Sequence, residues 1–351
     1  MLFRPSRLLL TSLMLGGFAT AAAADPLPDP NHTITIQLEN DSTRPGSDNY
    51  YTSGERIAYT SPTDQVPLPL ASLGHLLLGQ GQQRMALELS QNIYTPLLDK
   101  LSNPPLNDRP YAGVLLGTIS LIQDTDTTRT ALALGLGVIG PDALGEQVQN
   151  GFHTLIGQGS VGGWHTQLGN QPVIQLTAER TWRMPLGYIG ALETDVLPSA
   201  TLAAGTFRIY AQAGGTVRVG QGLQSDFGTP RIRPGLTGTD AYVQTQPLAW
   251  YVFAGADGQA VAWDETLDGL PFASSRHVTR QPFVGEFQFG FTLMAWGVRF
   301  TAEQVLQSNE FNGQRNGLFQ FTSASVSVPR MRRSQGAVER PPGSSSTATE
   351  A

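Results

Sequence analysis

Cysteine is absent from this chain of 351 residues, and charged residues make up only 14% of it, against about 25% in typical soluble domains. Without cysteine, no disulfide can hold the fold together, so hydrogen bonds and packing must do so. Beyond the N-terminal segment, no apolar run reaches the ~20 residues that a transmembrane helix needs. The net charge of −6 argues against a nucleic-acid partner, because such partners are bound by basic surfaces.

Low charge without a hydrophobic helix is typical of a transmembrane β-barrel. The strands of such a barrel alternate apolar side chains toward the lipid with polar or small ones toward the lumen, so the mean hydropathy stays near neutral. We therefore predict an all-β fold, a transmembrane antiparallel barrel.

Residues 1–24 have the features of a secretory signal. Arg4 and Arg7 precede the apolar run from Leu8 to Leu15, and small residues up to Ala24 provide a cleavage site. We therefore expect the mature protein to be exported.

The remainder shows no linker that would divide it into domains, so we predict one barrel domain over residues 25–328. Residues 329–351 differ in composition, because they are rich in arginine, proline and serine. Such a segment cannot bury a core, and we predict a disordered polar tail.

Alternation with a period of two residues predicts about twelve strands. The clearest examples are Ile34, Ile36 and Leu38 near the start of the chain and Phe287, Phe289 and Phe291 near its end. The segment 247–264 counts as one strand with a bulge near Gly255 to Gly258. An even number of strands suits a bacterial barrel.

Two further features fit a barrel. Aromatic residues near predicted strand ends suggest girdles at the membrane interfaces. Residues 220–246 are rich in Gly, Thr, Pro and Asp, as expected of an extracellular loop. The girdle candidates are Trp164, Trp182, Trp250, Trp263, Trp296, Tyr188 and Tyr251.

The segment from Gly140 to Gly157 is the one convincing helix, and we place a short helix near residues 141–157. It follows a predicted strand at 129–139 and contains His153, one of five histidines in the chain. A passive pore has no use for a helix that presents Glu146, Gln149, Asn150 and His153 beside a sheet, so the helix marks the candidate active site.

Polar residues also cluster at four predicted strand ends, and these clusters carry a resemblance to a known family. The clusters are Glu39-Asn40-Asp41, Asp48 to Gly54, Gln91 to Pro96 and Asn107 to Gly113. Together with the helix segment, and in this order, they resemble the outer-membrane lipid A 3'-O-deacylase (LpxR) family over the chain up to about Val328.

The resemblance implies a twelve-stranded barrel that hydrolyses the 3'-linked acyloxyacyl ester of lipid A and requires Ca²⁺. It places the catalytic histidine at His153, the family's Asn-Asp pair at Asn40 and Asp41, and its active-site threonine at Thr52. It implies that lipopolysaccharide in the outer leaflet of a Gram-negative outer membrane is the partner, and we expect a monomer.

Two cations near the site are candidate substrate-binding residues. Lys100, the only lysine in the chain, lies within about a residue of the family's lysine, so the match requires a small gap. Arg109 belongs to the fourth cluster. Either could meet a lipid A phosphate.

The chemistry of these residues agrees with ester hydrolysis. Imidazole can take a proton from water near neutral pH, and the oxyanion that forms requires positive charge. Asp41 and Asn40 offer oxygen ligands to a hard cation. Because adjacent strand residues face opposite sides, both reach one site only if the strand ends there; the run from Ser42 to Gly46 provides such an end.

Other interpretations stay open. Each residue has a structural alternative: His153 in helix packing, Asn40-Asp41 in a turn, Thr52 in a strand and Arg109 in a salt bridge. No G-x-S-x-G motif is present, but a phospholipase-like esterase with a serine nucleophile beside His153 fits the composition. The lack of His-x-x-x-His spacing argues against zinc. A non-catalytic pore or structural barrel is the third alternative.

Overall fold

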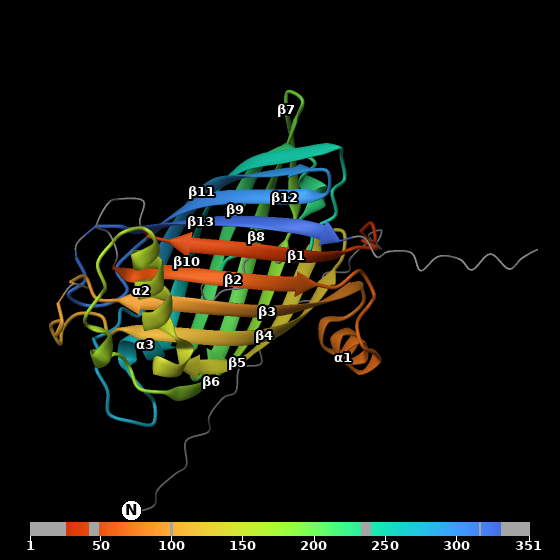
Figure 1. The fold of residues 1–351 in the computed structure, drawn as a ribbon. Coiled ribbons are helices and arrows are strands. Elements are labelled where there is room, and N and C mark those ends of the chain that lie inside the picture. The colour runs from red at the N-terminus through yellow and green to blue at the C-terminus, as the bar shows by residue number, and fades with distance from the viewer. Residues whose placement is uncertain (1–25, 42–48, 99–100, 233–239, 316, 331–351) are drawn as a thin grey trace, which may run out of the picture.

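The computed structural model describes residues 26–41, 49–98, 101–232, 240–315 and 317–330 (Figure 1). The expected signal peptide, Lys100 and nearly all of the expected tail lie outside these residues. None of the helices in the described residues is long and apolar enough to cross a membrane.

Thirteen strands form one antiparallel sheet, and twelve of them close into a barrel (Figure 1). β1 pairs with both β2 and β13, and β6 pairs with β8. β7 pairs with β8 alone among the described strands and extends from the barrel as a hairpin. The prediction of about twelve barrel strands is therefore confirmed.

The strands have the following bounds: β1 (His32–Asn40), β2 (Tyr50–Thr60), β3 (Gln82–Thr95), β4 (Ala112–Asp124), β5 (Thr128–Ile139), β6 (Gln171–Trp182), β7 (Met184–Ile189), β8 (Leu192–Gly205), β9 (Arg208–Gln221), β10 (Leu248–Asp264), β11 (Phe283–Ala295), β12 (Val298–Gln307) and β13 (Phe319–Arg330).

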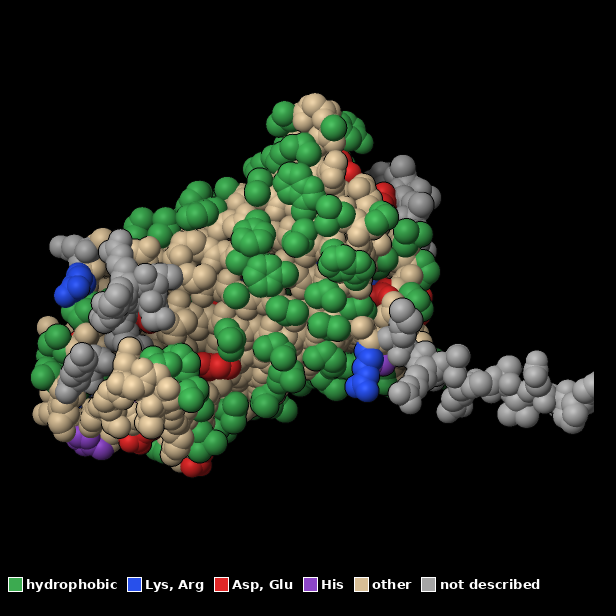
Figure 2. Space-filling view, turned by 45° about the horizontal axis from the view of Figure 1, so that its top comes forward, with side chains coloured by type: hydrophobic (Ala, Val, Ile, Leu, Met, Phe, Trp, Pro, Cys, Tyr) green, Lys and Arg blue, Asp and Glu red, His purple; other side chains and the backbone are tan. Residues whose placement is uncertain are grey.

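The two faces of the wall differ as the alternation predicts. In β1, Thr35 and Gln37 are buried toward the lumen, whereas Ile36 and Leu38 are more than half exposed. The phenylalanines at 287, 289 and 291 on β11 are also exposed. Figure 2 shows hydrophobic side chains over much of the visible wall, with few charged ones. This outward apolar surface is the lipid-facing side of a membrane barrel.

The two ends of the barrel differ in their connections. The end where β1 ends and β2 begins, here called the loop end, holds the longest connection, which joins β5 to β6 across residues 140–170. Because the longer loops of bacterial barrels are extracellular, the loop end faces outward from the cell. The opposite end, where β1 begins and β13 ends, is called the terminal end.

Short helices lie at both ends (Figure 1). The predicted helix near 141–157 is present as the 3₁₀ turn η1 (Pro141–Ala143) followed by α2 (Gly145–Leu155), and α3 (Glu265–Asp268) is also at the loop end. The sequence analysis missed α1 (Leu68–Leu78), because its leucines show no polar face; only Gly74 is buried. Two 3₁₀ turns complete the helical elements, η2 (Trp164–Thr166) and η3 (Leu223–Ser225).

Two detailed expectations are wrong. β10 does form one continuous strand, but its register shifts between Val261 and Trp263 and not near the predicted glycines. Trp164 is fully buried beneath the α2 segment, and Tyr251 points into the lumen. Neither can belong to an aromatic girdle, whereas Trp296, at 93% exposure, lies on the surface.

The connection between β9 and β10, expected to be an extracellular loop, begins and ends at the terminal end and folds into the barrel. Its Pro230 carbonyl accepts a hydrogen bond from Gln37 Nε2 at 2.9 Å, and the Ile232 amide donates to Glu39 Oε1 at 3.1 Å. Glu39 is near the loop end of β1, so this connection passes through most of the lumen. Its polar composition suits a polar lumen as well as it suits solvent.

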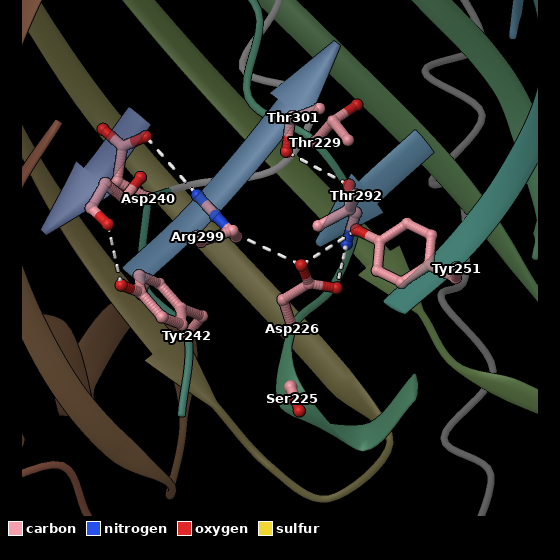
Figure 3. A network of polar contacts seen from close by, with 12 residues as sticks. Ser225, Asp226, Thr229, Asp240, Tyr242, Tyr251, Thr292, Arg299 and Thr301 are labelled. Carbon is pink, nitrogen blue, oxygen red and sulfur yellow. Dashed lines mark hydrogen bonds and ion pairs between the residues drawn. The ribbon is translucent and has the colours of Figure 1, made fainter. Parts of the chain in front are cut away.

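Buried ion pairs attach this connection to the wall (Figure 3). Asp226 Oδ1 lies 2.6 Å from Arg218 Nη1, and Asp226 Oδ2 accepts a hydrogen bond from the Tyr251 hydroxyl at 2.9 Å. Arg299 Nη1 lies 3.4 Å from the same carboxylate. The Asp226 carboxylate is therefore held by two arginines and one tyrosine from three strands of the wall, β9, β10 and β12.

We predict that Arg218→Met destabilises the barrel by about 3–5 kcal/mol, the usual cost of leaving buried charges without their partner. Arg218 is fully buried and also lies 2.6 Å from Asp195, so the substitution removes an ion-pair partner from two buried carboxylates. The measurement is the free energy of unfolding in detergent by urea titration.

Arg180→Met is the matched control, because Arg180 is exposed on β6 and its loss should change stability by less than about 0.5 kcal/mol. Equal stability of the two variants would show that the lumenal ion pairs do not hold the fold.

Candidate active site

The ends of β1 and β2 bring Asn40, Asp41 and Thr52 into direct contact. The Asp41 amide donates to the Thr52 carbonyl at 3.3 Å, and Asn40 Nδ2 donates to the same oxygen at 3.1 Å. The register between β2 and β3 shifts between Tyr51 and Ser53. Thr52 is therefore the extra residue of a β-bulge, a device that changes the direction of a side chain.

The three side chains are held in place. Asp41 and Thr52 are buried, although both lie beside a loop. Asp41 Oδ2 accepts a hydrogen bond from the Asn49 amide at 2.7 Å, and the Thr52 hydroxyl lies 2.7 Å from the Thr95 hydroxyl. β1 ends at Asn40, and such a strand end is what lets the adjacent residues Asn40 and Asp41 reach one site. The run 42–46, which was predicted to end this strand, lies outside the described residues.

The helix α2 lies against the outside of the wall at the loop end (Figure 1). η1 contacts β4 and β5, and α2 contacts β3 and β4, so the chain advances across the sheet toward β2. A Cβ atom on Gly145 would lie 3.0 Å from Gly113 Cα and 2.8 Å from the Trp164 ring. Glycine at this position therefore permits the close approach of helix and wall.

The register of the sheet connects the Asn40 cluster to the strand beneath the start of α2. Asn40, Ser53, Ile93 and Gly113 form one row across β1 to β4, and Gly113 lies beneath the start of α2. His153 follows Gly145 by eight residues, which is about 12 Å along a helix. At a strand spacing of about 4.8 Å, this distance corresponds to two to three strands, so a helix that runs across the sheet from Gly113 toward β2 directs His153 to the side where Ser53 and Asn40 lie.

The buried face of α2 presents Gln149 and His153 to this row. His153 Nδ1 lies 3.3 Å from the Gly159 carbonyl oxygen. A carbonyl can only accept, so Nδ1 carries the proton and Nε2 is the nitrogen able to take another. Gln149 Oε1 accepts a hydrogen bond from Trp164 Nε1 at 2.8 Å, which fixes the helix against the loop that follows it.

Arg109 lies elsewhere, inside the mouth of the barrel. It is 1% exposed, its Nη1 lies 2.6 Å from Glu310 Oε2, and its Nη2 donates to Thr266 Oγ1 at 2.7 Å. Its guanidinium also lies 4.4 Å from the centre of the Tyr94 ring. These contacts join the loops of the mouth and favour a structural role; substrate binding by Arg109 stays a prediction.

Glu265, at the start of α3, is a carboxylate in an apolar setting. It is fully buried, and neither of its carboxylate oxygens has a hydrogen-bond partner among the described residues. Burial, with a smaller contribution from the charge of Asp264, raises the pKa of Glu265 from 4.5 to about 8. The folded protein therefore holds a proton here that the unfolded chain releases.

We predict that Glu265 lowers the stability of the barrel as the pH rises. The stability that the protonated side chain contributes is fully present below about pH 4.5 and is lost as the pH rises through about 8. Glu265→Gln should remove this loss, which is at most about 1.4 kcal/mol for each unit of pKa shift. The measurement is the unfolding temperature of both proteins at about pH 5 and about pH 9.

Asp126→Asn is the control for this comparison, because Asp126 is exposed in the turn between β4 and β5 at the terminal end. A Glu265→Gln variant with the same pH dependence as the unaltered protein would contradict the assignment.

The Asn40 cluster offers only oxygen ligands. Because Asn40 Nδ2 donates to Thr52, its Oδ1 is the amide atom able to bind a cation, and Asp41 adds a carboxylate. Such donors fit a hard cation such as Ca²⁺. Within the described residues, no three acidic, histidine or cysteine side chains gather as a metal site, so substrate or backbone oxygens would have to complete the shell. Calcium stays a prediction.

Two polar side chains beside the cluster were missed from the sequence. Ser53 lies opposite Asn40, and Glu55 lies one step farther from the loop end on the same outward face. The signal was available: Ile57 and Tyr59 set the lipid-facing positions of β2, and counting back from them places Glu55 and Ser53 on the same face.

Comparisons with known proteins agree with this architecture. The model of a family described as outer membrane protein LpxR matches residues 8–329. The structure of LpxR from Salmonella typhimurium is similar, with a TM-score of 0.69 and 22% identity over 84% of this chain and 99% of that chain. The β domain of the Bordetella autotransporter BrkA covers 86% of this chain and 98% of its own at 10% identity, with a TM-score of 0.39 that is too low to support an argument. No curated protein sequence matches the chain.

Proposed function

Because the chain belongs to the LpxR family of outer-membrane proteins, we propose that it is a lipid A deacylase that hydrolyses the 3'-linked acyloxyacyl ester. The observation that supports this most is that Asn40 and Ser53 share an outward-facing row with Gly113, against which α2 packs, and that His153 is on the buried face of α2. A lipid substrate approaches from the membrane, so a lipid-modifying site belongs on the outer face of the wall and not in the lumen.

The position along the barrel suits lipid A. The site lies at the loop end, on the level of the outer leaflet, where lipopolysaccharide resides. Below it, Leu38, Ile36 and Leu89 are about half exposed on the outer wall, so acyl chains of the substrate can pack against them. The sugar and the ester would then lie beside Asn40, Asp41 and α2.

The residues of the site can carry out ester hydrolysis with water as the nucleophile. His153 takes a proton from water through Nε2, because Nδ1 is directed to the Gly159 carbonyl. Asn40 and Asp41 would hold Ca²⁺ through Oδ1 and a carboxylate oxygen, with the Thr52 hydroxyl beside them. A bound Ca²⁺ supplies the positive charge that stabilises an oxyanion. His153 then returns the proton to the departing sugar oxygen.

A serine esterase is the second candidate, because Ser53 lies opposite Asn40 in the row beneath α2. A nucleophilic serine would need the same histidine as its base. A passive pore is not favoured, since the described part of the β9–β10 connection occupies the lumen; the cavity between Phe227 to Thr229 and the wall has a volume of about 30 Å³, roughly the space of one water molecule.

We predict that lipid A from cells that express this chain loses its 3'-linked acyl chains, and that His153→Ala reduces the rate by at least about 10²-fold, the usual contribution of acid–base catalysis. The measurement is mass spectrometry of lipid A from cells in which the folded barrel is present.

His165→Ala is the matched control, because His165 is exposed in the same extracellular connection, and it should leave the rate unchanged. Unaltered lipid A would contradict the deacylase proposal. Ser53→Ala separates the two mechanisms: it should retain activity if water attacks the ester, and its inactivity would favour the serine esterase.

We predict that Asp41→Asn shifts deacylation to higher calcium concentrations or abolishes it, since removal of a carboxylate weakens a hard-cation site more than removal of an amide. Asn40→Ala should cause a comparable or smaller loss. The measurement is deacylation titrated with calcium after chelation.

Asp142→Asn is the control for Asp41, because Asp142 is exposed at the same end. If Asp41 instead orients His153, added calcium cannot rescue the variant. Full activity of the unaltered protein in excess chelator would remove the metal from the mechanism.

A further inference from the structure

Glu55 is an acidic side chain on the lipid-facing side of the wall. Its neighbour Arg56 points into the lumen, where its Nη1 lies 2.8 Å from Glu88. A Cβ atom on Gly54 would also point inward, toward the Tyr51 hydroxyl. Because strand residues alternate, Glu55 faces outward, although it is not an exposed residue.

The surroundings of Glu55 are unfavourable for an isolated charge. Its partners across β1 and β3 are Leu38 and Gln91, and Leu38 and Ile57 beside it are about half exposed to lipid. Ser53 is its hydrogen-bonding neighbour, but Oε2 is buried without a partner, and no arginine or lysine of the described residues pairs with Glu55. A carboxylate at such a position requires compensation from a cation or a polar ligand.

The register brings Glu55 within reach of the proposed cation site. Asn40 lies opposite Ser53, and Leu38 lies opposite Glu55, so Asn40 and Glu55 are diagonal neighbours, about 7–8 Å apart at the backbone. Two oxygens that share one Ca²⁺ at about 2.3–2.6 Å each are separated by at most about 5 Å. Because both side chains extend outward from the same face, they can converge on one ion.

We propose that Glu55 is an acidic ligand of the same divalent cation that Asp41 and Asn40 bind, an inference that rests on the proposed function. Two carboxylates balance the charge of Ca²⁺, which a site at the edge of the apolar wall needs more than a site in water does. Glu55 would then hold the ion from β2, while Asn40 and Asp41 would hold it from the end of β1.

Calorimetric titration of the chelated, detergent-solubilised full chain with calcium tests this proposal. Glu55→Gln should weaken calcium binding about tenfold, since ligand charge sets affinity in such sites, and saturating calcium should restore most of the deacylation rate. Glu55→Asp keeps the charge on a shorter side chain and should bind with intermediate affinity. Asp126→Asn is the control, because Asp126 is exposed in the turn between β4 and β5 at the terminal end, and the loss of a carboxylate there should leave the affinity unaltered.

Unchanged calcium affinity in Glu55→Gln overturns the proposal, and so does a raised KM for lipid A at unchanged affinity, which would make Glu55 a substrate contact. Deacylation by the unaltered protein without measurable calcium binding also overturns it, while the deacylase assignment stands. Calcium binding that depends on Glu55, in a protein that leaves lipid A unaltered, supports the ion site and contradicts the proposed function. A heat-dependent shift in gel mobility establishes that each variant is folded.

Discussion

The antiparallel pairing of β1 with β13 is the constraint on which the rest of the structure depends. In the hydrocarbon region of a membrane, a backbone N–H or C=O without a partner costs several kcal/mol, and only a closed sheet satisfies all of them. Once the first and last strands pair and β6 pairs with β8, the faces of every other strand are fixed. Apolar side chains then meet lipid, and polar ones are forced together in the lumen.

Closure of the barrel also leaves a space inside it that must be filled. Twelve strands enclose more space than their inward side chains fill, and the β9–β10 connection occupies it. Its carboxylates meet arginines from several strands, so Asp226 and Asp240 lie close to Arg218, Arg299 and Arg56. The guanidinium group suits this role, because it offers several donors in a fixed plane and stays charged when buried. The described part of the lumen is therefore held together by ion pairs, whereas Asn40, Ser53 and α2 lie on the outside of the wall.

On the outside, the active-site candidates depend on two departures from regular structure. The bulge at Thr52 turns its carbonyl toward Asn40 and Asp41, and the contact between Gly145 and Gly113 lets a helix lie flat on a strand. The first brings together residues that a regular strand would place on opposite faces. The second sets the height of α2 on the wall, and the buried face of this helix presents Gln149 and His153.

The sequence by itself determined the class of fold, the lipid-facing residues and the position of the short helix, because these follow from alternation and helical periodicity over a few neighbouring residues. It also brought Asn40, Asp41, Thr52 and His153 together as candidates, through five clusters in a fixed order. Only the tertiary structure decided that residues 222–232 enter the lumen, that Arg109 is buried against Glu310 and that Trp164 packs under α2. Each of these depends on contacts between residues far apart in the chain, and the register and closure of the sheet fix such contacts where local pattern cannot.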